Sequence, residues 1–128
     1  MISINFMVVA LGGGLGAVAR YAVSLMLPSF DPGRGLPVAT LTANALGCLV
    51  IGVLVAWLFV DGRLGGQWRL FLVVGVVGSF TTFSALSLET LQLFQAGRTT
   101  WAIGYALLSM IMLPLLCLAG WMIGRTLP

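Results

Sequence analysis

Four long apolar runs take up almost the whole chain, and they constrain its fold more than any other feature. They cover residues 4–27, 37–60, 68–96 and 99–126. Each is long enough for an α-helix to cross a bilayer core, which takes ~20 apolar residues. The sequence therefore predicts an all-α membrane protein, with four transmembrane helices in one domain over residues 1–128.

Composition argues against a water-soluble fold. Hydrophobic residues make up 60% of the 128 residues and charged residues make up 7%, whereas soluble domains have about 45–50% and about 25%. The six Arg are scattered, unlike the clustered basic surface of a nucleic-acid-binding protein. We therefore expect a multi-pass protein of the cell inner membrane or plasma membrane, surrounded by lipid and without a nucleic-acid partner.

The residue types that commonly carry catalysis form no site here. The chain has no His, and Cys48 and Cys117 lie inside apolar runs without CxxC spacing. We interpret both as small hydrophobic side chains. With no nucleophile–base pair and no phosphate-binding loop, the sequence predicts a protein that is not an enzyme.

Charge does not choose an orientation in the membrane. Short connections make neighbouring helices antiparallel, so both termini are expected on one side. That side has Arg63, Arg69 and Arg125, and the other has Arg34 and Arg98. Because the positive-inside rule then separates the two orientations by one charge, we infer dual topology, with an antiparallel dimer about a two-fold axis in the membrane plane. One fixed orientation is the alternative.

Turn and packing signals agree with four spans. Residues 28–35, 61–66 and 97–98 combine turn-forming residues with charges. GxxxG pairs, which allow close helix contact, occur at Gly12 and Gly16 and at Gly120 and Gly124. The tryptophans, which favour membrane interfaces, fall towards the ends of the runs at Trp57, Trp68, Trp101 and Trp121.

The third run is unusual for a membrane helix. Between Gly75 and Glu89 it contains two Gly, five hydroxyl side chains and the carboxylate. Non-helical backbone at bilayer depth is tolerated only where protein or a water-filled cavity satisfies it. We therefore expect a broken helix near Thr82, where free carbonyls suit a hard cation and a half-helix N-terminus favours an anion. A continuous helix with self-bonded hydroxyls is the alternative.

Polar residues of other runs would form a track beside the break. Asn44 follows Thr40, and Tyr105 and Ser109 are i,i+4 neighbours. An amide N–H of Asn44 is a neutral donor for an anion, and the positive ring edge of Phe83 also suits an anion. Interhelical hydrogen bonding and ordinary packing are the alternatives for these two residues.

The charged residues Arg20 and Glu89 lie inside the predicted spans, farther from the span ends than Arg69 and Arg125. Arg20 is near the end of the first, and Glu89 is late in the third. Intramembrane charges suggest function by default, so we assign both to the electrostatics of a vestibule, with Arg20 attracting anions. Snorkelling to the interface is the alternative for Arg20.

These residues, in this order, resemble the CrcB/Fluc family of fluoride channels. The matching elements are Gly16 to Tyr21, Thr40 to Asn44, Gly78 to Ser84 with Glu89 following, and Tyr105 with Ser109. The resemblance implies a fluoride-selective channel that exports cytoplasmic fluoride by passive flow, and so gives fluoride resistance. It also implies two pores at the interface of an antiparallel homodimer.

The resemblance further implies roles for single residues. Asn44 would donate to fluoride and Phe83 would present its ring edge. Gly78 and Thr81 would give backbone carbonyls to a structural sodium ion at the dimer axis. The other implied pore residues are Thr40, Thr82, Ser84, Tyr105 and Ser109.

Two positions depart from the family pattern. Leu86 stands where a second Phe is usual, and Leu113 stands where a further hydroxyl is often found. These departures imply either a channel with altered throughput or selectivity for fluoride, or a homologous partner subunit that supplies the missing Phe ring or hydroxyl. Two other functions stay open: a proton-coupled small multidrug exporter with dual topology, although no acid precedes Asp31, and a non-transporting assembly subunit.

Overall fold

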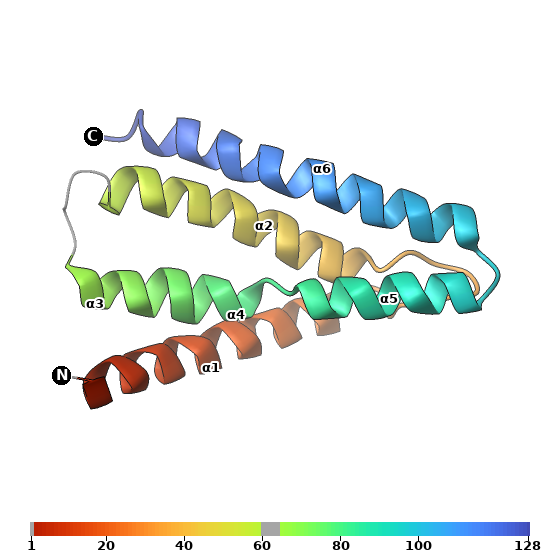
Figure 1. Ribbon diagram of the computed structural model, residues 1–128, viewed down its shortest axis with the longest axis horizontal. Coiled ribbons are helices and arrows are strands. Elements are labelled where there is room, and N and C mark those ends of the chain that lie inside the picture. Colours follow the sequence, from red (N-terminus) through yellow and green to blue (C-terminus); the bar gives the residue numbers. More distant parts are fainter. Residues whose placement is uncertain (1, 60–64) are drawn as a thin grey trace.

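The computed structural model describes residues 2–59 and 65–128, in which all regular structure is helical (Figure 1). Within these residues four segments are long and apolar enough to cross a membrane: Ile4–Met26, Val38–Leu58, Gly66–Gln95 and Thr99–Gly124. The prediction of an all-α protein with four membrane-spanning helices is confirmed at this level. Most of the turn expected at 61–66, together with Arg63, lies outside the described residues.

The spans are built from α-helical and π-helical pieces. The first is α1 (Ile2–Met26), and the second is α2 (Val38–Leu54) continued by η1 (Val55–Phe59). The third consists of α3 (Gly66–Arg69), η2 (Leu70–Val77), α4 (Gly78–Phe80) and α5 (Phe83–Gln95). The fourth is α6 (Thr99–Gly124). Both chain ends lie at the same end of the bundle (Figure 1), as an even number of antiparallel spans requires.

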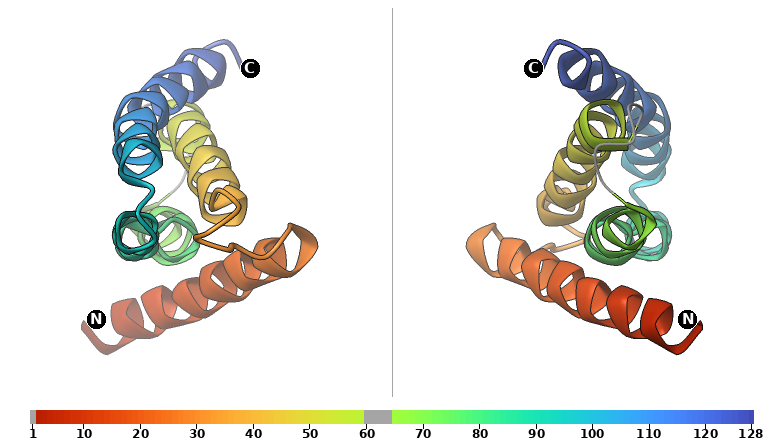
Figure 2. Two further views of the ribbon diagram at one scale, coloured as in Figure 1. Left: turned by 90° about the vertical axis from the view of Figure 1, so that its right-hand side faces the viewer. Right: turned by 90° about the vertical axis from the view of Figure 1, so that its left-hand side faces the viewer.

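The third span lies between the first span and the other two. In Figure 2, α1 crosses obliquely on one side of the third span, whereas α2 and α6 lie on the opposite side. The main contacts join α1 to η2 and α4, α2 to α6, and α5 to α6. The first and second spans therefore contact the middle of the third, and the fourth span contacts its second half, α5.

Glycines set the distance between these helices. A Cβ on Gly16 would overlap the carbonyl oxygen of Val76 in η2, and one on Gly120 would overlap that of Leu49 in α2. Gly12 and Gly124 are similarly close to η2 and α2. Both predicted GxxxG pairs therefore lie at helix contacts within the chain, where a side chain would push the backbones apart.

The α1–α2 connection and the α5–α6 turn lie at the end of the bundle opposite the termini, and hydrogen bonds join them. Gly97, with a φ of 75°, ends α5 and lets the Arg98 N–H bond the Leu93 carbonyl at 3.0 Å, which is a Schellman motif. The Arg98 side chain then donates to the carbonyls of Pro32 at 3.1 Å and Gly35 at 2.6 Å. Arg98, expected only as a loop charge, therefore joins the α5–α6 turn to the α1–α2 connection.

Little apolar surface is buried within one copy of the chain. The buried cluster consists of Leu86, Leu93, Ala102 and Tyr105. By contrast, Phe6 is 72% exposed and many other large apolar side chains of α1 and α6 are exposed. Lipid or another chain must cover these faces. Leu86, which replaces the usual Phe of the family pattern, packs in the core between α5 and α6.

Candidate functional site

Two extended residues separate α4 from α5. Thr81 has φ −83° and ψ 152°, and Thr82 has φ −150° and ψ 119°. The Thr81 hydroxyl donates to the Val77 carbonyl at 3.1 Å, so it satisfies the end of the preceding helix. The Thr82 Oγ1 accepts from the Ala85 N–H at 3.2 Å and so caps α5, and it lies 3.0 Å from the Ser84 Oγ.

Asn44 of α2 pairs with the backbone of this link. Its Nδ2 donates to the Thr82 carbonyl at 3.0 Å, and its Oδ1 accepts from the Thr82 N–H at 2.7 Å. Asn44 is only 4% exposed. In a continuous α-helix the Thr82 N–H would bond the Gly78 carbonyl four residues earlier. Asn44 takes that donor, and the Gly78 carbonyl is released.

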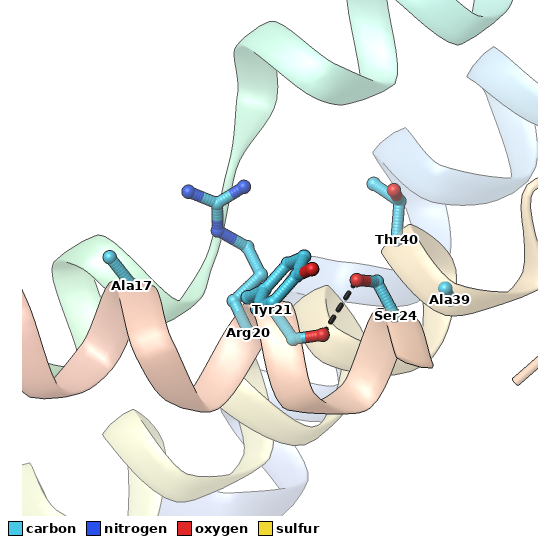
Figure 3. Close-up of a pocket in the computed structure, with 6 residues that line it drawn as sticks. All are labelled: Ala17, Arg20, Tyr21, Ser24, Ala39 and Thr40. Atoms are coloured by element: carbon cyan, nitrogen blue, oxygen red, sulfur yellow. Dashed lines mark hydrogen bonds between the residues drawn. The ribbon is translucent and has the colours of Figure 1, made fainter. Parts of the chain in front are cut away.

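Arg20 reaches the same link from α1. Its side chain extends towards the segment between α4 and α5 (Figure 3), and its Nε donates to the Ser79 carbonyl at 3.3 Å. Arg20 also lines a pocket of about 250 Å³ with Ala17, Tyr21, Ser24, Ala39 and Thr40. A cation and several hydroxyls therefore face one cavity next to the link.

Glu89 joins three of the four spans. Its Oε1 accepts from the Thr40 hydroxyl of α2 at 2.5 Å, and its Oε2 accepts from the Tyr105 hydroxyl of α6 at 2.8 Å. Hydrogen bonds to charged groups are stronger than those between neutral groups. Because Thr40 also lines the pocket, this group connects the pocket to the buried side of α6.

One turn beyond Tyr105 on α6, Ser109 presents a polar group inside the protein. It is 1% exposed, and its Oγ has no hydrogen-bond partner among the described residues. Tyr105 is 4% exposed. The i,i+4 spacing thus placed both hydroxyls on one interior face. An unpaired buried hydroxyl calls for an explanation, for example a site for a polar species.

Phe83 and Gly78 lie on the outside of the single chain. Phe83, the first residue of α5, is 74% exposed, and Gly78 is also exposed. Neither is enclosed by this copy. A pore wall containing Phe83 would need a second chain.

Most of the predicted polar site residues lie in one of two groups. Thr81, Thr82 and Ser84 lie at the link with Asn44, whereas Thr40, Glu89 and Tyr105 form a separate cluster. Arg20 bonds to Ser79 and is not paired with Glu89. Sequence reasoning did not pair Glu89 with Thr40 and Tyr105, because the three come from different spans and sequence spacing has no signal for contacts between spans.

This fold and these contacts define a small multi-pass membrane protein whose polar groups converge on its third span. The family described as CrcB-like protein, Camphor Resistance (CrcB), matches residues 7–121. The chain belongs to this family, as its sequence motifs suggested.

Curated relatives match over almost their full length. A protein of Thermus thermophilus is 44% identical over 123 residues, which cover 96% of this chain and 95% of the relative. A protein of Paracoccus denitrificans is 42% identical over 124 residues, which cover 96% of each. A protein of Ruminiclostridium cellulolyticum is 38% identical over 97% of this chain and 92% of the relative. All three are named fluoride-specific ion channel FluC.

Proposed function

We propose that this chain is a subunit of a fluoride-specific ion channel that lets cytoplasmic fluoride leave the cell by passive flow. The observation that carries this proposal is the match to relatives of that name, at 42–44% identity over 96% of the chain. The protein is a membrane channel component and not an enzyme.

The link and its neighbours supply suitable groups for an anion path. The Asn44 Nδ2 carries two N–H groups, of which one is donated to Thr82, and we assign the other to fluoride. The exposed ring of Phe83 offers its positive edge. Hydroxyls from Thr82, Ser84 and Ser109 would replace water of hydration along the path. Thr40 and Tyr105 would line it while their hydroxyls donate to Glu89.

The second element of the proposal is an antiparallel dimer in which each copy completes the pores of the other. Phe83 and Gly78 are exposed in one copy, and the charge count differs by only one between the two sides. An inverted copy that packed on this face would enclose both residues. The partner is a second copy of this chain or, if the pore requires a second Phe ring, a homologous subunit that supplies the ring absent at Leu86.

A structural sodium ion at the link is the third element. Neutral carbonyl oxygens suit a hard cation, and Asn44 removes the helical donor of the Gly78 carbonyl. Thr81 is extended, which also takes its carbonyl out of a helical ladder. These two carbonyls from each of two copies would hold the ion, which would stabilise the dimer without taking part in conduction.

Fluoride efflux tests the function directly. Purified protein in liposomes loaded with KF or KCl should release fluoride, measured with a fluoride electrode, and retain chloride. Thr90→Val is a control variant that should conduct like the wild type, because among the described residues the Thr90 hydroxyl bonds the Leu86 carbonyl of its own helix, at 2.7 Å. Equal fluoride and chloride flux would contradict selectivity. Flux that requires a pH gradient would favour an exporter, and no flux would favour an assembly subunit.

Dual topology needs a separate measurement. Ser29→Cys in the α1–α2 connection, in a chain with Cys48→Ala and Cys117→Ala, provides one thiol outside the spans. An impermeant maleimide added to intact cells should label about half of the copies, and the rest should react after permeabilisation. Labelling of all copies or none in intact cells would show one orientation.

A further inference from the structure

A groove at the C-terminal end of α6 combines apolar and cationic groups. It has a volume of about 460 Å³ and is lined by Leu118, Trp121, Met122, Arg125 and Thr126. The first four follow i, i+3, i+4 and i+7 spacing, so they form one face of the helix. Leu118 is 52% exposed and Met122 is 60% exposed, so this copy of the chain leaves the face open.

Arg125 is held at the end of this groove with its polar groups available. Its guanidinium carbon lies 4.8 Å from the centre of the Trp121 ring, a cation–π contact. Among the described residues its side chain makes no hydrogen bond or ion pair. Thr126 is different, because its hydroxyl donates to the Ile123 carbonyl at 2.8 Å. Arg125 is therefore the group in the groove that can recognise an anion.

We propose that this groove binds an anionic phospholipid, with the headgroup phosphate on Arg125 and an acyl chain along Leu118 and Met122. The groove is complementary to such a lipid in two ways. Guanidinium groups bind phosphate oxygens in a bidentate manner, and the apolar face continues towards the middle of the span. Trp121 is near the end of the span Thr99–Gly124, and tryptophan favours the depth where headgroups meet hydrocarbon.

Native mass spectrometry of the purified protein with equal amounts of phosphatidylglycerol and phosphatidylcholine tests this proposal. The wild-type protein should retain phosphatidylglycerol about fivefold over phosphatidylcholine, the preference expected from one Arg near an anionic lipid. Arg125→Gln should bring the ratio close to one. Arg34→Gln is the matched control, because Arg34 is an exposed Arg in the connection at the opposite end, and it should keep the wild-type ratio.

Two further measurements separate a lipid site from simpler explanations. Inorganic phosphate in large excess should leave phosphatidylglycerol bound, because it lacks an acyl chain. Arg125→Lys should retain most of the preference, which keeps the test valid if Arg125→Gln folds poorly. Equal retention of both lipids by the wild-type protein would overturn the proposal. So would displacement by phosphate, or an equal loss of preference in Arg34→Gln, which would indicate diffuse charge attraction.

Discussion

The side-chain amide of Asn44 exchanges two hydrogen bonds with the backbone of Thr82, at 2.7 and 3.0 Å. This is the pairing that a neighbouring strand would offer, made here by one side chain from another helix. An unsatisfied backbone group in hydrocarbon costs several kcal/mol. Asn44 thus satisfies the extended link between α4 and α5 at the depth where water is scarce.

Loss of this pairing should affect both stability and flux. Asn44→Ala leaves the Thr82 N–H and carbonyl unpaired, at about 1–3 kcal/mol for each group. We expect thermal unfolding in detergent at a clearly lower temperature and fluoride efflux reduced more than tenfold. Asn44→Asp should rescue neither property, because a carboxylate at this buried position would be unpaired and would face the Thr82 carbonyl. Wild-type flux in either variant would contradict the assignment of Asn44 to the fluoride path.

Phe83 should affect flux without affecting stability. Its side chain is 74% exposed, so Phe83→Ile removes little packing within the chain but removes the ring edge. We expect fluoride efflux to fall at least tenfold, with the melting temperature nearly unchanged. Phe94→Ile, at another exposed position of α5 (58%), is the control and should conduct normally. If both variants conduct equally well, the ring edge of Phe83 has no part in conduction.

Substitutions of Thr40 and Tyr105, which both donate to Glu89, should have coupled effects on the free energy of unfolding. Thr40→Val and Tyr105→Phe each remove a donor to the carboxylate, at about 1.5–3 kcal/mol. Because both donors share Glu89, the double variant should deviate from additivity by about 0.5 kcal/mol or more. Reversible unfolding in detergent would measure these free energies. Strict additivity would mean that the two hydroxyls act independently.

Because α1 packs closely on η2, two glycine substitutions in α1 should differ in their effect on stability. A Cβ at Gly16 would overlap the Val76 carbonyl, whereas a Cβ at Gly14, on the same helix, would meet nothing within 4 Å. Gly16→Ala should therefore destabilise the protein by about 1–3 kcal/mol. Gly14→Ala should be neutral or slightly stabilising, since Ala favours helix. Folded yield and melting temperature distinguish the two variants, and equal values would argue against this contact.

Arg20 should have two separable effects. Its Nε donates to the Ser79 carbonyl, so Arg20→Met should lower the melting temperature. Its charge faces the pocket in Figure 3, so fluoride efflux through the wild-type protein should weaken with ionic strength because salt screens exposed charges. Arg20→Gln, which keeps N–H donors without charge, should recover stability while its flux becomes insensitive to salt. Unchanged salt sensitivity would exclude a role for this charge in attracting fluoride.

The number of spans and the helix contacts at the two GxxxG pairs could be predicted from the sequence alone, whereas the equally close contacts at Gly47 and Gly52 were not predicted. Run length decides whether a helix crosses a bilayer, and glycine at i and i+4 decides where backbones can touch, since both are local properties. The content of Gly, Ser and Thr between Gly75 and Glu89 singled out this segment in the sequence, but the extended backbone angles of Thr81 and Thr82 are known only from the structure.

The partner of each polar side chain depended on tertiary structure. Glu89 bonds Thr40 and Tyr105 across three spans, Arg20 bonds Ser79, and Arg98 joins two loops. Hydrophobic patterning gives each span an apolar length, but it does not give the rotation and depth at which helices pack against one another. Those depend on how all the surfaces fit together, and they decide which hydroxyl meets which carboxylate.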